Sequence, residues 1–505
     1  MSGEAFSHIG QLSSDGKWRW DGAAWRSVAT ESNSRSLPHW LNLQLKDRAT
    51  WLTLAAALAV GLTADQALRV GTFGLAASLT LALIGLALVF AGRIATPQSR
   101  MLVGVSALFA AWLTVRASPW LLWPDLAMSF ALVGLAACVA TRGSLLDMGI
   151  AEAGAHSARV VMNGVAGAKF AIAPLVRARR RPALVAPIAR GVLIAAPIAA
   201  LVSALLAAAD PVFASFFNLN FDFGQLTIDA TFVAAGALVA AGLLRLAAAE
   251  PLARVDGPAW RLGSVEGLVV LAVLDAVFAA FAVAQAIAAA GAARDALRTA
   301  GVTYADYARS GFFQLLWVAG ITAVVLILFS RITRLAERTT KRAFQVLSLI
   351  AIGLTLLIVF VAFQRLQLYE EAYGFTMLRL YSHIFAVWIG LIFLLLAADF
   401  AGFFKRRRWL VGATCASAMA VLMALNVVNP EAFVVSLNID WAQTTHNVDT
   451  QYLATLSSDA TPALLASESP DITRIACAGP YTYSVSAAAF NWSDATAASL
   501  RRARC

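Results

Sequence analysis

Long apolar runs separated by short polar segments dominate the chain. The runs are about 18–25 residues long, which is the length at which an α-helix crosses a bilayer core of about 30 Å. They lack the period-two alternation of membrane β-barrel strands. The pattern predicts about eleven spanning helices, at residues 51–68, 71–92, 100–116, 119–140, 184–208, 226–246, 264–290, 312–330, 344–364, 377–400 and 409–428. The third and fourth are joined by a tight turn and could instead form a hairpin that does not cross fully.

Composition agrees with this pattern. The chain is 60% hydrophobic and 13% charged, whereas soluble domains are about 45–50% apolar and about 25% charged. We therefore expect an all-α fold, a polytopic integral membrane helix bundle, with the lipid bilayer as its main partner. The net charge of +10 does not indicate nucleic-acid binding, because the positive residues lie in short loops beside apolar runs, where membrane topology accounts for them.

Lys and Arg are unequally divided between alternate loops. If the N-terminus is cytoplasmic, the inner segments hold 27 of these residues and the outer loops hold seven. Cytoplasmic loops are enriched in Lys and Arg, so we expect the N-terminus inside, the C-terminus outside and an odd number of helices. The expected domains are a cytoplasmic region 1–50, a transmembrane bundle 51–429 containing a cytoplasmic basic loop 141–183, and an extracytoplasmic region 430–505.

Two features bear on targeting and source. The first apolar run begins at Trp51 after a polar stretch, so we expect an uncleaved first helix rather than a cleaved signal peptide. Arg outnumbers Lys 34 to 5, a bias that favours a GC-rich bacterial genome. The expected location is a bacterial cytoplasmic membrane.

The N-terminal region contains a Trp-rich segment at about residues 11–28. Two Asp-Gly pairs in it mark turns, and Trp18 and Trp20 are spaced to lie on one face of a strand. We expect a miniature sheet of two or three strands. It is interpreted as a packing module or a contact site for a protein partner, with ligand binding as the alternative.

The basic loop 141–183 has apolar positions that suit helices lying on the membrane surface. Four arginines follow directly. Basic runs beside membrane helices usually determine topology; the alternative is specific binding of anionic lipid. The four residues are Arg177, Arg179, Arg180 and Arg181.

Several stretches together resemble a family of bacterial membrane proteins known as domain of unknown function 4173, which is related to number 4153. The stretches are Arg116–Leu121 (RASPWL), Ala204–Phe213 (ALLAAADPVF), Val302–Leu315 (VTYADYARSGFFQL), Leu368–Arg379 (LYEEAYGFTMLR), Asn429–Ala432 (NPEA) and Tyr452–Leu464 (YLATLSSDATPAL). The resemblance covers most of residues 50–465. It implies a polytopic inner-membrane protein and supplies no activity.

Soluble-enzyme motifs and metal-ligand pairs are absent from the sequence, and no cofactor is expected. The remaining candidates are ionisable groups within the membrane. Placing such a group in the bilayer costs free energy, and these groups are often functional. Asp275 lies in the middle of a predicted span, and Glu266 and Gln285 lie roughly on the same side of that helix. The Asp275 carboxyl is interpreted either as a structural group, paired with Arg190 or in a helix–helix hydrogen bond, or as a proton- or substrate-handling group. A misplaced helix boundary is the remaining alternative.

A second group of candidates lies at the outer surface. Tyrosines there suit an interfacial aromatic belt, and the alternative is a site for a cationic or envelope ligand. The residues are Asp210, Tyr304, Asp306, Tyr307, Arg309, Tyr369, Glu370, Glu371, Tyr373, Arg379 and His383. Cys477 and Cys505 are the two cysteines outside the bilayer, and an oxidising compartment favours a disulfide between them over two free thiols.

The function predicted first is transport or ion permeation through the bundle, with Asp275 as its key polar group. The alternative is a non-transporting envelope sensor or assembly scaffold. A third is a membrane-embedded transferase acting on a lipid-linked substrate through the outer Asp, Glu and Tyr groups. An enzyme is the less expected class.

Overall fold

The computed structural model describes two short strands near the N-terminus and most of residues 45–140, 150–179, 223–250, 261–287, 311–403 and 409–505. The chain divides into two units, Met1–Gln44 and Leu45–Cys505. The predicted helix 184–208 lies outside the described residues, apart from isolated positions.

The first unit contains an antiparallel pair of strands, β1 (Trp18–Trp20) and β2 (Trp25–Ser27). Trp20 is paired with Trp25, and the sequence between them begins with Asp-Gly. Both strands fall within the segment where the Trp and Asp-Gly pattern predicts a sheet.

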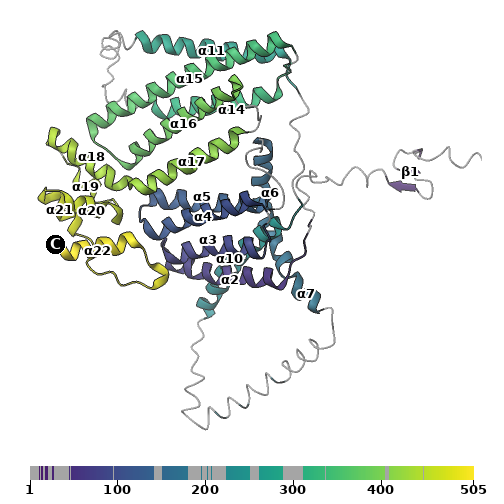
Figure 1. Cartoon of the computed structure of the whole chain (residues 1–505), viewed down its shortest axis with the longest axis vertical. Coiled ribbons are helices and arrows are strands. Elements are labelled where there is room, and N and C mark those ends of the chain that lie inside the picture. Colours follow the sequence, from purple (N-terminus) through teal and green to yellow (C-terminus); the bar gives the residue numbers. More distant parts are fainter. Residues whose placement is uncertain are drawn as a thin grey trace, which may run out of the picture. The chain divides into compact units, whose positions relative to one another are not determined.

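The second unit begins with a group of packed helices (Figure 1). Helix α10 packs against α2 and α6, and α3, α4 and α5 pack in sequence order. Proline occupies the first turn of α4 and of α5, where its missing N–H costs no hydrogen bond. The helices are α2 (Trp51–Val70), α3 (Leu75–Phe90), α4 (Pro97–Val115), α5 (Pro119–Cys138), α6 (Ile150–Ala171), α7 (Ala173–Arg179) and α10 (Phe223–Ala247).

Small residues allow close helix contact in this group. A Cβ built on Gly61 of α2 would lie 2.5 Å from the carbonyl oxygen of Val233 on α10. One built on Gly236 of α10 would lie 2.4 Å from the Cβ of Ala64 on α2. Helices packed in a bilayer gain mainly from such close van der Waals contact, so these glycines fix the approach of α2 and α10.

Buried hydroxyl groups link α3, α4 and α5. The hydroxyl of Ser78 donates to the carbonyl of Ala110 at 2.6 Å, and that of Ser99 donates to the carbonyl of Ala136 at 2.5 Å. Interhelical bonds from Ser and Thr are typical of membrane helix bundles. They join helices whose facing surfaces are otherwise apolar.

A second group of helices follows along the chain. Helix α15 packs against α11, α14 and α16, and α17 contacts both α16 and α5. Phe344, Phe393 and Leu326 are almost completely buried in its core. The helices are α11 (Ser264–Ile287), α14 (Phe312–Ile332), α15 (Arg338–Tyr373), α16 (Met377–Ala401) and α17 (Trp409–Val428).

The C-terminal region folds into a helical tail at one end of the spans (Figure 1, yellow). Its small core includes Val435, Leu453 and Ile472, and a disulfide joins Cys477 to Cys505 with a Cα–Cα distance of 5.8 Å. The elements are α18 (Pro430–Thr445), α19 (Thr450–Leu453), η3 (Ser458–Ala460), α20 (Thr461–Ala466), α21 (Pro470–Cys477), η4 (Ala487–Ala489) and α22 (Trp492–Arg504).

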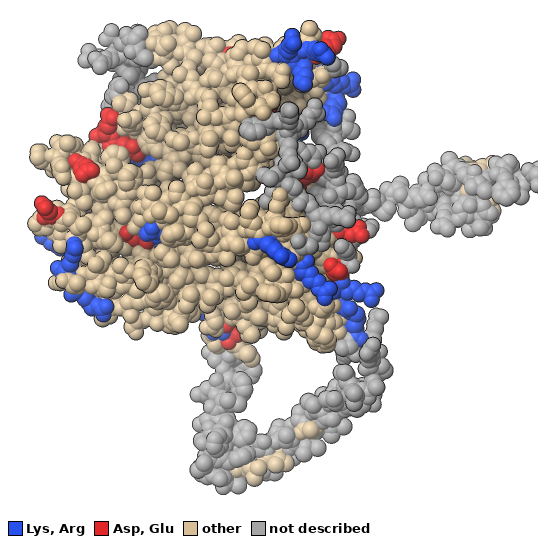
Figure 2. Space-filling view, viewed as in Figure 1, with Lys and Arg blue, Asp and Glu red and all other residues tan. Residues whose placement is uncertain are grey.

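Within the described residues, nine helices are long and apolar enough to cross a membrane, and Leu75–Phe90 is a shorter apolar helix. Figure 2 shows a broad face almost without charge, with charged side chains gathered mainly towards its two ends. Large apolar side chains such as Trp317, 72% exposed, lie on the surface. A soluble protein rarely exposes so much contiguous apolar area, so the chain is a helical membrane protein.

Candidate functional site

Three segments that are distant in the sequence meet where the tail joins the bundle. They are the turn between α4 and α5, the turn between α17 and α18, and the turn before η3. Each belongs to a stretch that carries the sequence resemblance. Their polar side chains are buried or half-buried and are linked by hydrogen bonds, and we call this set the tail–bundle polar cluster: Arg116, Ser118, Asp125, Asn426, Glu431, Ser457 and Asp459.

Two carboxylates of the tail hold the turn between α4 and α5. One oxygen of Asp459 accepts from the backbone N–H groups of Ala117 and Ser118, at 3.0 and 2.8 Å. Glu431 accepts from the Ser118 hydroxyl at 2.6 Å, and from the backbone and hydroxyl of Ser457 at 2.8 and 2.6 Å. Both carboxylates are at most 2% exposed, so these bonds replace water.

The start of α18 places Glu431 in this cluster. Asn429 has a φ of 58°, in the left-handed region, and its side chain caps the helix by accepting from the backbone of Ala432. Pro430 occupies the first turn. Asn tolerates this conformation better than most residues, so the Asn-Pro-Glu sequence turns the chain sharply and brings Glu431 beside Ser118.

Burial raises the pKa of Glu431, the hydrogen bonds from Ser118 and Ser457 lower it, and the nearby Asp459 raises it further. The net direction is upward from its ordinary value. Burial removes the water that would solvate a charged carboxylate. Glu431 is therefore easier to protonate than an exposed glutamate.

Asp125 and Asn426 continue the cluster into the spans. The side-chain amide of Asn426 on α17 donates to Asp125 on α5 at 2.8 Å, and both residues are fully buried. The second oxygen of Asp125 and the amide oxygen of Asn426 have no hydrogen-bond partner among the described residues. Buried polar atoms without partners are uncommon in folded proteins.

Arg116 links the parts of the cluster. Its guanidinium donates to the backbone carbonyl of Asn426, with the Nε–O distance at 2.9 Å. One of its nitrogens lies 4.0 Å from Asp459, and its charge sits over the ring of Trp112, 5.5 Å from the centroid. It also covers the end of α17, where unsatisfied carbonyls favour a cation.

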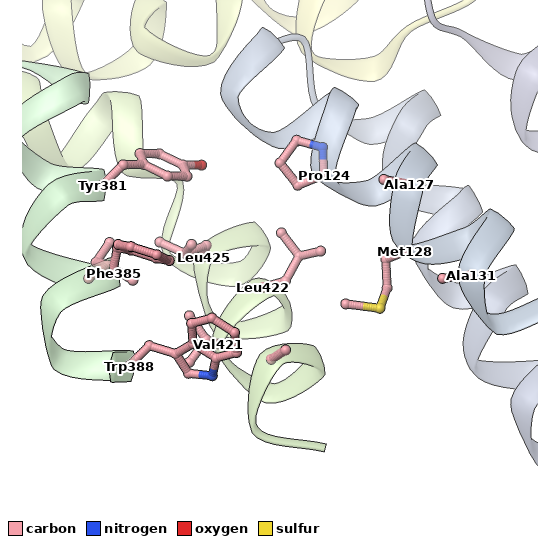
Figure 3. A pocket seen from close by; sticks show the side chains of 12 residues that line it. Pro124, Ala127, Met128, Ala131, Tyr381, Phe385, Trp388, Val421, Leu422 and Leu425 are labelled. Carbon is pink, nitrogen blue, oxygen red and sulfur yellow. The ribbon is translucent and has the colours of Figure 1, made fainter. Parts of the chain in front are cut away.

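An apolar groove of about 410 Å³ lies between α5, α16 and α17 (Figure 3). Tyr381 borders it, and the hydroxyl of this residue donates to the carbonyl of Trp120 at 2.8 Å. Pro124 and Leu425, which also line the groove, directly neighbour Asp125 and Asn426 in the sequence. The full lining is Pro124, Ala127, Met128, Ala131, Tyr381, Ile384, Phe385, Trp388, Ala418, Val421, Leu422 and Leu425.

The structure brings together several of the residues predicted at the outer rim, at the corner between α15 and α16. The carboxylate of Glu370, 5% exposed, lies 3.2 Å from Nδ1 of His383. The guanidinium of Arg379 stacks on the ring of Tyr369, 4.4 Å from its centroid, and donates to the carbonyl of Tyr373 at 3.1 Å. The side chain of Glu371 is exposed, and its carbonyl accepts from Trp441 of the tail.

The tail is also hydrogen-bonded directly to this corner. The side chain of Asn438 donates to the carbonyl of Phe375 at 2.8 Å and accepts from its N–H at 3.1 Å. The hydroxyl of Tyr452 accepts from the N–H of Met377 at 2.6 Å. The tail thus bonds to turns in both groups of helices.

Asp275 lies on the buried stripe of α11, between Leu271 one turn earlier and Phe278 one turn later. It is 8% exposed, and neither carboxylate oxygen has a partner among the described residues. Ser348, on the neighbouring helix α15, likewise has a buried hydroxyl without a described partner. In this part of the second helix group, two neighbouring helices therefore carry buried polar groups without a hydrogen-bond partner among the described residues.

The other predicted residues are placed as follows. Glu266 is exposed at the start of α11 and accepts from the N–H of Gly263 at 2.9 Å. Gln285 is half-buried near the other end of that helix. Arg177 of α7 donates to the carbonyls of Ala173 and Ala49. The following lie outside the described residues: Arg180, Arg181, Arg190, Asp210, Tyr304, Asp306, Tyr307 and Arg309.

Asp125, Asn426, Glu431 and Asp459 were not singled out from the sequence. Asp125, like Asp275, is a carboxyl inside an apolar run. The same criterion applied to Asp125 would have identified it from the sequence. Glu431 and Asp459 lie in the tail, where a carboxylate has no local reason to be buried. In the described part of the chain, no group of three or more His, Cys, Asp and Glu side chains is arranged to hold a metal ion.

The fold and the tail–bundle polar cluster define a multi-pass helical membrane protein with a folded tail bonded to one end of its bundle. The sequence profile of the domain of unknown function (DUF4153) matches residues 103–467, and the chain belongs to this family. Membership of the related domain of unknown function 4173 is not shown. No curated protein and no solved structure is significantly similar to the chain.

Proposed function

We propose that the chain is a multi-pass protein of a bacterial cytoplasmic membrane that moves a small solute or an ion through the second group of helices. The observation that carries this proposal is the buried Asp275 carboxyl, which lacks a described partner halfway along a spanning helix. A charge at that depth costs about 2.5–3.5 kcal/mol on insertion scales. Proteins retain such groups mainly where protons, ions or substrates pass.

The proposed orientation places the N-terminus in the cytoplasm and the tail outside. The unequal division of Lys and Arg between alternate loops supports it. The disulfide between Cys477 and Cys505 supports an oxidising compartment for the tail. In this orientation the tail–bundle polar cluster faces the extracytoplasmic side.

The test is thiol labelling of Asp275→Cys in intact membranes with a small water-soluble maleimide. Cys138 and Cys415, which lie outside the disulfide, are replaced by Ala, while the disulfide is kept because bonded cysteines do not react. Two controls bracket the result. Glu371→Cys, on the exposed outer corner, should label, and Val273→Cys, 59% exposed on the same apolar helix, should not, because it faces lipid.

Labelling of position 275 without labelling of position 273 would support a hydrated path to Asp275. If position 275 stays unlabelled while position 371 reacts, Asp275 is a packed structural group, and transport is rejected. Leu271→Cys serves as a further check, since Leu271 is fully buried on the same stripe. Equal labelling at 271 and 275 would report general loosening of the helix and would also count against a path.

A second candidate function is an extracytoplasmic sensor or assembly scaffold. The observation that favours it is the attachment of the tail, which bonds to the turn between α4 and α5 and to the corner between α15 and α16. A ligand or partner bound by the tail would thereby reach both helix groups. Two variants distinguish the candidate functions. A scaffold should keep its function in Asp275→Asn and lose it in Asn438→Ala, whereas a transporter should lose its function in Asp275→Asn.

A further inference from the structure

A polar basin of about 490 Å³ lies at the opposite end of the second helix group from the tail. The end of α14, the start of α15, the end of α16 and the segment before α11 enclose it. Small-molecule sites usually measure about 300–1,000 Å³. The lining is Arg261, Ser330, Arg331, Thr333, Leu335, Lys341, Phe344, Gln345, Asp399, Phe400 and Gly402.

Hydrogen bonds between the elements fix the walls of this basin. The N–H of Leu262 donates to the carbonyl of Ile332 at 2.9 Å, and the N–H of Arg334 donates to the carbonyl of Leu262 at 3.0 Å. The guanidinium of Arg261 donates to the carbonyl of Arg331. These bonds attach the segment before α11 to the end of α14, so Arg261 and Arg331 are held beside each other.

The other side of the basin is fixed in the same way. The side chain of Gln345 on α15 donates to the carbonyl of Phe400 on α16 at 3.1 Å. Phe344, 1% exposed, lies 6.3 Å from Phe400 between ring centroids. Apolar rings thus form part of the wall, and the charged groups are arranged around them.

The charges in the lining do not balance. It contains three cations, Arg261, Arg331 and Lys341, and one carboxylate, Asp399. Asp399 also accepts from the indole N–H of Trp409 at 3.1 Å, so part of its hydrogen-bonding capacity is already used. A basin with an excess of fixed cations attracts an anion with several acceptor oxygens.

The position of the basin relative to the hydrocarbon core indicates that this anion is a lipid head group. The apolar runs of α14 and α16 end at Ser330 and Asp399, and that of α15 begins after Arg342. The basin therefore lies where three spans leave the hydrocarbon core, at the level of lipid head groups. Phe403, 79% exposed beside it, suits contact with acyl chains.

We propose that this basin binds the phosphate group of an anionic phospholipid, with Arg261, Arg331 and Lys341 around the phosphate and the acyl chains on the adjacent apolar surface. This site is separate from the arginines of α7 and from Asp275. The competing explanation is that these cations only fix the orientation of the helices. That explanation depends on the number of positive charges in the loop and not on which of them line the basin.

The same loop supplies a matched control for this difference. Arg334, between α14 and α15, and Arg338, the first residue of α15, are exposed positive residues that do not line the basin. The variant Arg331→Gln/Lys341→Gln removes two basin cations. The variant Arg334→Gln/Arg338→Gln removes the same charge from the same loop outside the basin.

The experiment measures retention of phosphatidylglycerol and of phosphatidylcholine by the purified full-length protein, using native mass spectrometry. We expect wild type and the Arg334/Arg338 variant to retain phosphatidylglycerol preferentially, and the Arg331/Lys341 variant to bind it about tenfold or more weakly. Equal weakening in both variants would overturn the proposal, as would an absence of preference in wild type. Matching thermal unfolding of the two variants shows that lost binding is not lost folding.

A second arm separates a lipid from a soluble ligand. Millimolar glycerol phosphate is added to the protein with bound phosphatidylglycerol. Retention of the lipid supports a site that requires the acyl chains as well as the phosphate. Displacement of the lipid would assign the basin to a soluble phosphate compound and overturn the assignment to a phospholipid.

Discussion

The side-chain amide of Asn426 lies 2.8 Å from the carboxylate of Asp125, and this buried bond joins α17 to α5. Helix α17 otherwise contacts the second group of helices through α16. The pair is therefore a polar link between the two groups. Because Arg116 also donates to the backbone of Asn426, the same residue connects the spans to the turn that the tail holds.

Asn426→Leu should destabilise the protein by about 1–3 kcal/mol, because Asp125 would remain buried without its donor. The double variant Asp125→Leu/Asn426→Leu should recover much of this loss, since neither polar group is then left unsatisfied. Thermal unfolding in detergent measures both. The single variant Asp125→Leu completes the comparison. If the loss of stability in the double variant equals the sum of the losses in the two single variants, the bond between the residues contributes nothing of its own.

The pH dependence of stability should change in Glu431→Gln. Burial raises the pKa of Glu431 in the folded protein, so the folded state holds this proton more tightly than the unfolded chain does. The contribution of Glu431 is therefore largest below its ordinary pKa of 4.5 and is lost as pH rises through its folded pKa. Between pH 4 and 8, the unfolding temperature of wild type should rise relative to that of the variant as pH falls. A difference that stays constant with pH would refute this.

Reduction of the disulfide should loosen the tail. Cys477 and Cys505 are 28 residues apart, and closing a loop of this size stabilises a fold by about 3 kcal/mol. We expect faster proteolysis of the tail in reductant or in Cys477→Ser, with the spans unaffected. As a control, denatured protein should react with two equivalents of maleimide before reduction and four afterwards, because Cys138 and Cys415 lie outside the disulfide. Four equivalents before reduction would mean that the bond is absent.

Gly236→Ala should weaken the contact between α2 and α10, because the added Cβ would lie 2.4 Å from the Cβ of Ala64. Overpacking of this kind costs about 1–3 kcal/mol. Gly104→Ala is the matched control, since a Cβ there meets nothing within 4 Å and Ala favours a helix by about 1 kcal/mol. Thermal unfolding should fall in the first variant and hold or rise in the second; equal effects would contradict the proposed contact.

The apolar runs predicted the described helices well and their ends less well. The helix expected at 344–364 extends over Arg338–Tyr373, because polar residues beyond the apolar core continue the helix outside the membrane. The helix expected at 71–92 begins later, at Leu75. Gly71, with a φ of 67°, ends α2, and Gly74 precedes α3. The number of spans and their orientation stay predictions.

The candidate site was harder to predict from the sequence than the helices were, for a physical reason. Helix periodicity reports which face of one helix is buried, but not which distant groups meet there. Ser118 and Glu431 are 313 residues apart, and Asn438 lies 63 residues from Phe375. Asp275 was found because its own surroundings are apolar, whereas Asp459 is buried only through the turn it binds.

The tail is synthesised after all the described spans, and this order has a consequence for how the protein is made. Until Asp459 arrives, the N–H groups of Ala117 and Ser118 lack the acceptor they have in the finished fold, and until Glu431 arrives the Ser118 hydroxyl lacks its acceptor. Docking of the tail also requires the corner between α15 and α16 to be in place, because Asn438 bonds to Phe375. The tail therefore makes all of these bonds only once both groups of helices are in place, so a chain with a missing or misplaced helix would leave its tail undocked.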